Sequence, residues 1–324
     1  MSKSKKYFGL LIKVIIGVVS FLIIYTRLKD SFDIELLNRA FEKFSIIGLV
    51  GISLLLIILL AINWGIEAYK WKMIVNDIEA ISYKTSIKSI LSGVCVGNLA
   101  PGRATEFLAK IHFFKIENKG NITMLHFLNG MFQLIVTIFF GVIGLLFRFK
   151  TDGFSEDTWL VWIGLTLSAI IILTFLFFLR NTDFISRWIY MKIIKSDSEL
   201  KSVRISFNKA LKLLCLSVIR YAAFFAQFAI MLLLFSELNF SFHVASGVFL
   251  YFLFTTIIPM FSVIEAAVRT AIVLLVFVNA LENSTVLVFC ALMIWIINIV
   301  IPSIIGYFIL LNEKLTLKSF VFKK

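Results

Sequence analysis

The chain has 324 residues, of which 60% are hydrophobic and 16% are charged, and its net charge is +13. Soluble proteins are roughly half apolar and a quarter charged, so this composition indicates a protein that crosses a membrane several times. No polar block is longer than a loop. We therefore expect one transmembrane domain over residues 1–324, without a soluble catalytic domain.

Six apolar stretches are long enough to cross a hydrocarbon core of about 30 Å, which takes roughly 20 helical residues. In chain order they lie at residues 7–26, 45–63, 123–147, 158–179, 210–236 and 285–311. Trp64, Tyr69 and Trp71 follow the second stretch, and we interpret them as anchors at the membrane surface, where aromatic rings gather. The expected fold class is an all-α, polytopic membrane bundle with about six full spans.

Two further apolar regions, residues 86–116 and 244–279, are each interrupted by a proline, Pro101 in the first and Pro259 in the second. Proline breaks a helix because it lacks the backbone N–H and clashes with the preceding turn. The resulting pieces are short for independent spans. The pattern predicts two broken or re-entrant helical hairpins, and paired interruptions of this kind mark binding sites in membrane transporters.

The distribution of basic residues predicts the orientation, because cytoplasmic loops carry an excess of Lys and Arg. With a cytoplasmic N-terminus, the inner segments contain 22 Lys and Arg and the outer segments contain 6. This topology makes both ends of 86–116 cytoplasmic and both ends of 244–279 external, so the hairpins have opposite orientations. Both termini are then cytoplasmic, and the basic segment 180–209 lies against the inner leaflet.

Charged residues follow both breaks at helical spacing. Such groups are costly inside a membrane, and they usually pair with one another or serve transport. Because arginine offers two parallel donors to a phosphate, we expect the first break to contact an anionic headgroup. The candidate substrate-binding residues are Asn98, Pro101, Gly102, Arg103, Glu106 and Lys110 at the first break, Pro259, Glu265 and Arg269 at the second, and Arg220 within a span.

Structural roles are alternatives for several of these residues. Glu265 and Arg269 lie four positions apart, so they either lock one helix or take part in transport. Arg220 is either a third cavity residue or half of a structural ion pair.

Signatures of other function classes are missing from the sequence. It contains no catalytic or phosphate-loop motif, and its three histidines and three cysteines lack metal-site spacing, so we expect neither a metal nor another cofactor. The positive charge is explained by cytoplasmic loops, and we expect no nucleic-acid partner. An enzymatic function is therefore less expected than transport.

The order of short elements resembles the transmembrane region of lysylphosphatidylglycerol synthases, also described as the flippase-like domain family. The first element matches at Asn98, Pro101, Arg103 and Glu106, and Lys110 stands near an arginine of the family pattern. The second element keeps Glu265 but lacks the Gly-Gly pair that usually follows its proline. The resemblance covers nearly the whole chain.

The resemblance implies a multi-pass protein of a prokaryotic cell membrane that moves a phospholipid or lipid-linked headgroup between leaflets. It also implies membrane lipids as partners, together with a separate synthase or glycosyltransferase. Two alternatives stay open. One is a membrane-embedded transferase that acts on lipid-linked sugar with Glu106 as its base, and the other is a non-catalytic scaffold that recruits a synthase through segment 180–209.

Overall fold

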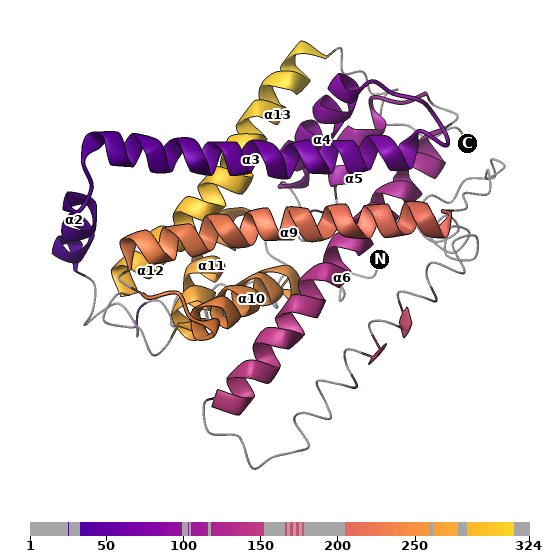
Figure 1. Cartoon of the computed structure of the whole chain (residues 1–324). Helices are drawn as coiled ribbons and strands as arrows, with labels where there is room; N and C mark the ends of the chain where they lie inside the picture. The colour runs from indigo at the N-terminus through magenta and orange to yellow at the C-terminus, as the bar shows by residue number, and fades with distance from the viewer. Residues whose placement is uncertain are drawn as a thin grey trace, which may run out of the picture.

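The structure is a computed structural model of the chain. It describes residues 33–98, 105–115, 118–151, 205–236, 238–258, 262–277 and 284–313, together with Tyr25, Arg103 and scattered positions between 166 and 177. Every regular element in these ranges is helical, as the composition predicts (Figure 1). The elements are α2 (Ile34–Glu42), α3 (Ile46–Val75), α4 (Tyr83–Gly97), α5 (Glu106–Ile111), α6 (Lys119–Thr151), α9 (Phe207–Phe235), α10 (Phe242–Ile257), α11 (Ser262–Val276), α12 (Ser284–Trp295), η5 (Ile296–Val300) and α13 (Ile301–Asn312).

Four helical stretches are long and apolar enough to cross a membrane: α3, most of α6, α9, and the continuous run Ser284–Asn312 formed by α12, η5 and α13. They correspond to the predicted spans 45–63, 123–147, 210–236 and 285–311. The main difference is at the end of α3, which continues to Val75. The predicted spans 7–26 and 158–179 lie almost entirely outside the described residues.

Serine side chains begin several of these helices. An N-cap serine accepts a hydrogen bond from a backbone N–H of the first turn, which contributes about 1 kcal/mol. Two of these serines stand immediately before apolar runs and two stand a few residues before them, so the helix starts are set by local features of the sequence. The capping residues are Ser45, Ser82, Ser206 and Ser241.

The long helices α3 and α9 run side by side in opposite directions (Figure 1). Their pairing is fixed at three levels along the two helices. Lys209 forms an ion pair with Asp77 at one end, Arg220 binds Asn63 in the middle, and Gln227 donates to the backbone oxygen of Leu56 farther along. The middle level places an arginine in the interior of the bundle.

The first hairpin is formed by α4 and α5, which pack closely because α4 has glycines at 93 and 97. A Cβ atom on Gly93 would lie 2.9 Å from Cε of Lys110, and one on Gly97 would lie 3.1 Å from Cβ of Glu106. Small residues four positions apart allow helices in membranes to approach closely. These two glycines therefore create the space for the charged side chains of α5.

The second hairpin is formed by α10 and α11, and its two ends lie together beside the end of α6. Arg148 of α6 donates to Oγ of Ser246 at 3.1 Å and to the backbone oxygen of Val276 at 3.2 Å. One arginine thus joins the beginning of α10 to the end of α11. The side of the membrane on which region 244–279 begins and ends, and the depth of its tip, stay predictions.

A π-helical turn, η5, interrupts the last long helix. Pro302 follows it within the first turn of α13. A proline clashes with the carbonyl four residues earlier, here that of Asn298, and a wider turn relieves such a clash. The side chain of Asn298 is buried, so the widened turn points an amide into the bundle.

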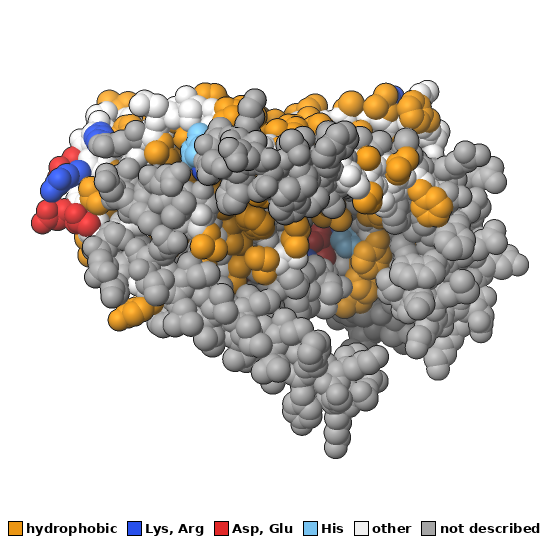
Figure 2. All heavy atoms as spheres, turned by 90° about the horizontal axis from the view of Figure 1, so that it is seen from below, with side chains coloured by type: hydrophobic (Ala, Val, Ile, Leu, Met, Phe, Trp, Pro, Cys, Tyr) orange, Lys and Arg blue, Asp and Glu red, His pale blue; other side chains and the backbone are white. Residues whose placement is uncertain are grey.

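The buried hydrophobic side chains form two clusters with polar residues between them. Along α3, Leu56 belongs to the first cluster and Trp71 to the second, while Asn63 and Glu67 lie between them and are also buried. Hydrophobic side chains also cover much of the described surface, as expected where lipid is the solvent (Figure 2). The polar zone therefore lies inside an apolar bundle.

Candidate functional site

A cavity of about 390 Å³ lies in the polar zone and joins residues from both proline breaks. Of the residues singled out in the sequence, it brings together Arg103, Arg220, Glu265 and Arg269. Three arginines and one glutamate therefore line one internal space. The other lining residues are Trp64, Gln133, Thr137, Tyr221, Phe224, Phe252, Thr255, Thr256, Ile257, Ile258, Ile294, Trp295, Asn298 and Ile299.

Arg103 has an unusual backbone conformation. Its φ of 56° lies in the left-handed region, and within the described ranges no other residue except glycine has a positive φ. This conformation is sterically costly for a side chain with a Cβ, and such strain is concentrated at functional sites. Nη1 of Arg103 lies 3.9 Å from the nearest oxygen of Glu106, which is a loose ion pair. The guanidinium therefore retains donors for another partner.

Four buried hydrogen-bond donors on the cavity wall lack a partner among the described residues. They are Nε1 of Trp64, Nη2 of Arg103, the hydroxyl of Tyr221 and Nε1 of Trp295. Buried polar atoms are almost always hydrogen-bonded, because an unmade bond costs about 1 to 3 kcal/mol. Indole and guanidinium groups only donate. The wall is therefore complementary to a ligand with several acceptor oxygens.

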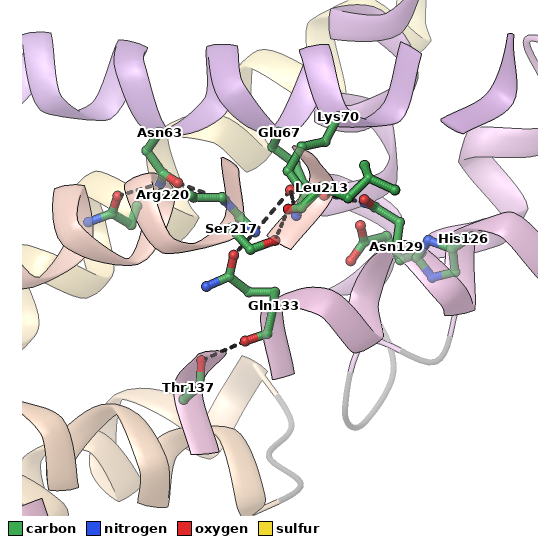
Figure 3. Close-up of polar contacts among 12 residues, drawn as sticks. Asn63, Glu67, Lys70, His126, Asn129, Gln133, Thr137, Leu213, Ser217 and Arg220 are labelled. Atoms are coloured by element: carbon green, nitrogen blue, oxygen red, sulfur yellow. Dashed lines mark hydrogen bonds and ion pairs between the residues drawn. The ribbon is translucent and has the colours of Figure 1, made fainter. Parts of the chain in front are cut away.

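Arg220 is held in place by a buried polar network at the centre of the bundle (Figure 3). Its Nη1 lies 3.1 Å from Oε2 of Glu67, and its Nε donates to Oδ1 of Asn63 at 2.8 Å. Glu67 also accepts from Asn129 at 2.8 Å and lies 3.4 Å from Nζ of Lys70. Arg220 thus lines the cavity and also forms a buried ion pair, so the two roles considered for it in the sequence do not exclude each other.

The network continues through amide side chains to the π-helical turn. Nδ2 of Asn63 donates to Asn298 at 3.3 Å, and Nδ2 of Asn298 donates to Gln227 at 2.9 Å. Gln227 in turn donates to the backbone oxygen of Leu56 at 3.1 Å. A chain of hydrogen bonds therefore links α3, α9 and η5, and it makes this wall of the cavity rigid.

Glu106 and Lys110 support the first break without lining the cavity. Oε1 of Glu106 lies 2.6 Å from Nζ of Lys110, which also contacts Nδ1 of His126 at 3.2 Å and lies over the ring of Trp71. Lys110 is almost fully buried. The carboxylate of Glu106 faces Lys110, so Glu106 is poorly placed to act as a base on a ligand in the cavity.

Glu265 and Arg269 form a tight pair on α11. Nε and Nη2 of Arg269 both donate to Oε1 of Glu265, at 3.0 and 2.9 Å, and Nη1 donates to the hydroxyl of Tyr251 at 3.4 Å. The pair therefore locks α11 against α10 and lines the cavity as well.

Of the remaining predicted residues, the structure describes Asn98, which is not part of the cavity wall. Asn98 lines a neighbouring groove and donates to Oγ of Ser303. Pro101, Gly102 and Pro259 lie outside the described residues, as does most of segment 180–209.

The prediction that Trp71 is a surface anchor is wrong. Trp71 is fully buried, and its Nε1 donates to Oγ of Ser89 at 3.1 Å. The predicted span ends at residue 63, whereas α3 continues to Val75. Glu67 and Lys70 therefore lie beyond the predicted span, although their spacing of three positions is typical of a helical pair. Continuing the helical pattern past Trp64 would have identified them.

Metal-ligating residues are not clustered in the part of the chain that the structure describes, where no three His, Cys, Asp or Glu side chains are placed to share an ion.

Comparison with known proteins identifies the family. No curated protein matches the chain. The family model described as the lysylphosphatidylglycerol synthase TM region matches residues 10–306, which is nearly the whole sequence. Together with the long apolar helices, this match shows a multi-pass integral membrane protein. The chain belongs to the lysylphosphatidylglycerol synthase transmembrane-region family.

Proposed function

We propose that this protein moves a phospholipid or a lipid-linked headgroup between the leaflets of a prokaryotic cell membrane, and that the anionic headgroup passes through the 390 Å³ cavity. The observation that carries this proposal is a wall with three arginines and four donors unpaired among the described residues, one of which belongs to Arg103. A phosphate group has the oxygen acceptors that such a wall requires.

The balance of buried charge supports an anionic ligand. Among the described residues in and behind the wall, four largely buried cations, those of Lys70, Lys110, Arg220 and Arg269, and the half-buried Arg103 face only three carboxylates, those of Glu67, Glu106 and Glu265. Uncompensated charge is costly away from water. An anionic headgroup would neutralise part of this excess, which a neutral ligand would not do.

The cavity wall also suits a ligand that is only partly polar. Phe224, Phe252, Ile294 and Ile299 line it beside the arginines. In the proposed path, Arg103 receives the headgroup from the cytoplasmic leaflet, Arg220 holds it in the centre, and the Glu265–Arg269 pair lies along its exit. The cytoplasmic location of both termini is part of this proposal.

A leaflet-resolved transport assay in proteoliposomes tests the proposal. Liposomes that contain fluorescent phosphatidylglycerol and the purified chain should expose internal probe to a membrane-impermeant quencher faster than empty liposomes do. Trp295→Phe keeps an aromatic ring but removes one cavity donor, and Trp71→Phe is its matched control outside the cavity. A hydrogen bond to a charged group contributes about 1.5 to 3 kcal/mol.

Trp295→Phe and Arg103→Met should therefore slow transport about tenfold or more, since 1.4 kcal/mol corresponds to a factor of ten. Trp71→Phe and the exposed-site variant Arg39→Met should transport at the wild-type rate. Wild-type rates in Arg103→Met, with normal membrane insertion, would contradict the proposal.

A further inference from the structure

A second hollow, the α13 groove, borders the cavity. It has a volume of about 510 Å³ and a mostly apolar wall. Three of its large side chains, Ile304, Tyr307 and Phe308, are more than half exposed on the outside of the bundle. The groove is therefore open toward the surroundings of the protein, which are lipid for a membrane-spanning helix. Its wall consists of Asn98, Glu265, Trp295, Ile299, Val300, Ser303, Ile304, Tyr307 and Phe308.

The α13 groove and the cavity share a wall. Glu265, Trp295 and Ile299 line both. Two of these shared residues are polar, and one of them, Trp295, has an unpaired donor at Nε1. A polar space with unpaired donors is thus separated by one layer of side chains from an apolar space that opens sideways.

The π-helical turn lies at the boundary between the two spaces. Trp295 immediately precedes η5, and Ile299 and Val300 lie within it. A π turn is wider than an α turn and is frequent at functional sites. Asn298 holds it from behind through its hydrogen bonds to Gln227 and to the backbone oxygen of Ile294. Hydrogen bonds of Asn298 therefore hold η5 on the side that faces the interior of the bundle. On the opposite side, Val300 lines the groove.

We propose that the α13 groove holds a hydrocarbon chain of the same lipid whose headgroup occupies the cavity, so that the lipid enters sideways between α11 and α13. This inference rests on the proposed function, and it adds a chain-binding subsite and an entry side. An apolar groove has no hydrophobic preference for one lipid chain over bulk lipid. Chain occupancy should therefore depend on the headgroup that is bound next to it.

Photo-crosslinking of a lipid chain tests the inference. The probe is phosphatidylglycerol with a diazirine in one acyl chain, supplied in nanodiscs that contain the full chain, and crosslinked peptides are located by mass spectrometry. We expect crosslinks to residues 299–308, with a severalfold loss in Arg103→Met. Crosslinks to Ile58, which is exposed on α3 and outside both hollows, should not change.

Two neighbouring variants provide a matched pair. Ile304 lines the groove, whereas Ile305 is about equally exposed on the same helix and does not. Ile304→Trp should fill the groove and reduce both the crosslinks and the retention of the probe severalfold, while Ile305→Trp should behave as wild type. Binding of soluble glycerol phosphate should be unaffected by Ile304→Trp, because that ligand has no chain.

Crosslinks at 299–308 that persist unchanged in Arg103→Met would show ordinary lipid solvation and would overturn the inference. Equal probe retention in Ile304→Trp and Ile305→Trp would overturn it as well. Failure of the proposed function can be distinguished from failure of this inference. A protein that binds the lipid without transporting it would show headgroup-dependent crosslinks and no leaflet exchange. A free phosphate ligand would show glycerol phosphate binding with no groove dependence for the lipid probe.

Discussion

Replacing Glu67 with glutamine tests the buried network most sharply. Glu67 is the carboxylate that lies between Arg220 at 3.1 Å and Lys70 at 3.4 Å, and Lys70 is fully buried. Glu67→Gln keeps the shape and the acceptor for Asn129 but removes the negative charge. Two buried cations then face each other without compensation, and breaking a buried pair costs about 3 to 5 kcal/mol.

The assay is thermal unfolding of the purified protein in detergent, followed by tryptophan fluorescence. The matched control is Glu35→Gln, because Glu35 pairs with Arg39 on the surface at 3.3 Å and both side chains are largely exposed. Exposed pairs contribute about 0 to 1 kcal/mol, so the control should hardly change the melting temperature.

A second substitution checks the cause of the destabilisation. Adding Lys70→Met to Glu67→Gln removes one of the two uncompensated cations, so the double variant should be more stable than Glu67→Gln alone. Such coupling between contacting residues is what a double-mutant cycle measures. Equal melting temperatures for Glu67→Gln and Glu35→Gln would show that the Glu67 carboxylate does not compensate the charges of Arg220 and Lys70.

Two further predictions concern helix packing. A Cβ atom on Gly306 would lie 2.0 Å from the backbone oxygen of Leu91, whereas one on Gly51 would meet nothing within 4 Å. Gly306→Ala should therefore lower the melting temperature. Gly51→Ala should raise it, because the higher helix propensity of alanine increases the free energy of unfolding by up to about 1 kcal/mol. A stabilising Gly306→Ala would contradict the close approach of α13 to α4. Trp71→Phe should destabilise the protein by about 1 kcal/mol, because it removes the buried hydrogen bond to Ser89. An unchanged melting temperature would show that this hydrogen bond does not contribute to stability.

The helices themselves were largely predictable, since their apolar runs and N-cap serines are local features of the sequence. The end of α3 was misplaced because Trp64, Glu67 and Lys70 resemble the polar edge of a span. In the structure these residues face the interior, where partners from α6 and α9 compensate the charge. This charge compensation depends on tertiary contacts, so it cannot be predicted from a local sequence pattern.

The site was predictable in part. The proline breaks pointed to Arg103, Glu265 and Arg269, which the fold brings to one cavity. Asn63 and Arg220 are 157 positions apart, so their pairing is invisible in a single sequence. The unpaired donors of Trp64 and Trp295 could not be predicted either. A tryptophan in an apolar run usually packs in the core or anchors a span, and only its neighbours in the fold show whether its N–H has a partner.

The most direct test of the central claim is an experimental structure of the full chain in nanodiscs of phosphatidylglycerol, at a resolution that shows lipid density. We expect a phosphate within hydrogen-bonding distance of Arg103, Tyr221 and Trp295. We also expect chain density from the same molecule to leave along the α13 groove. A cavity that contains only water, with lipid confined to the outer surface of the bundle, would contradict headgroup binding in the cavity.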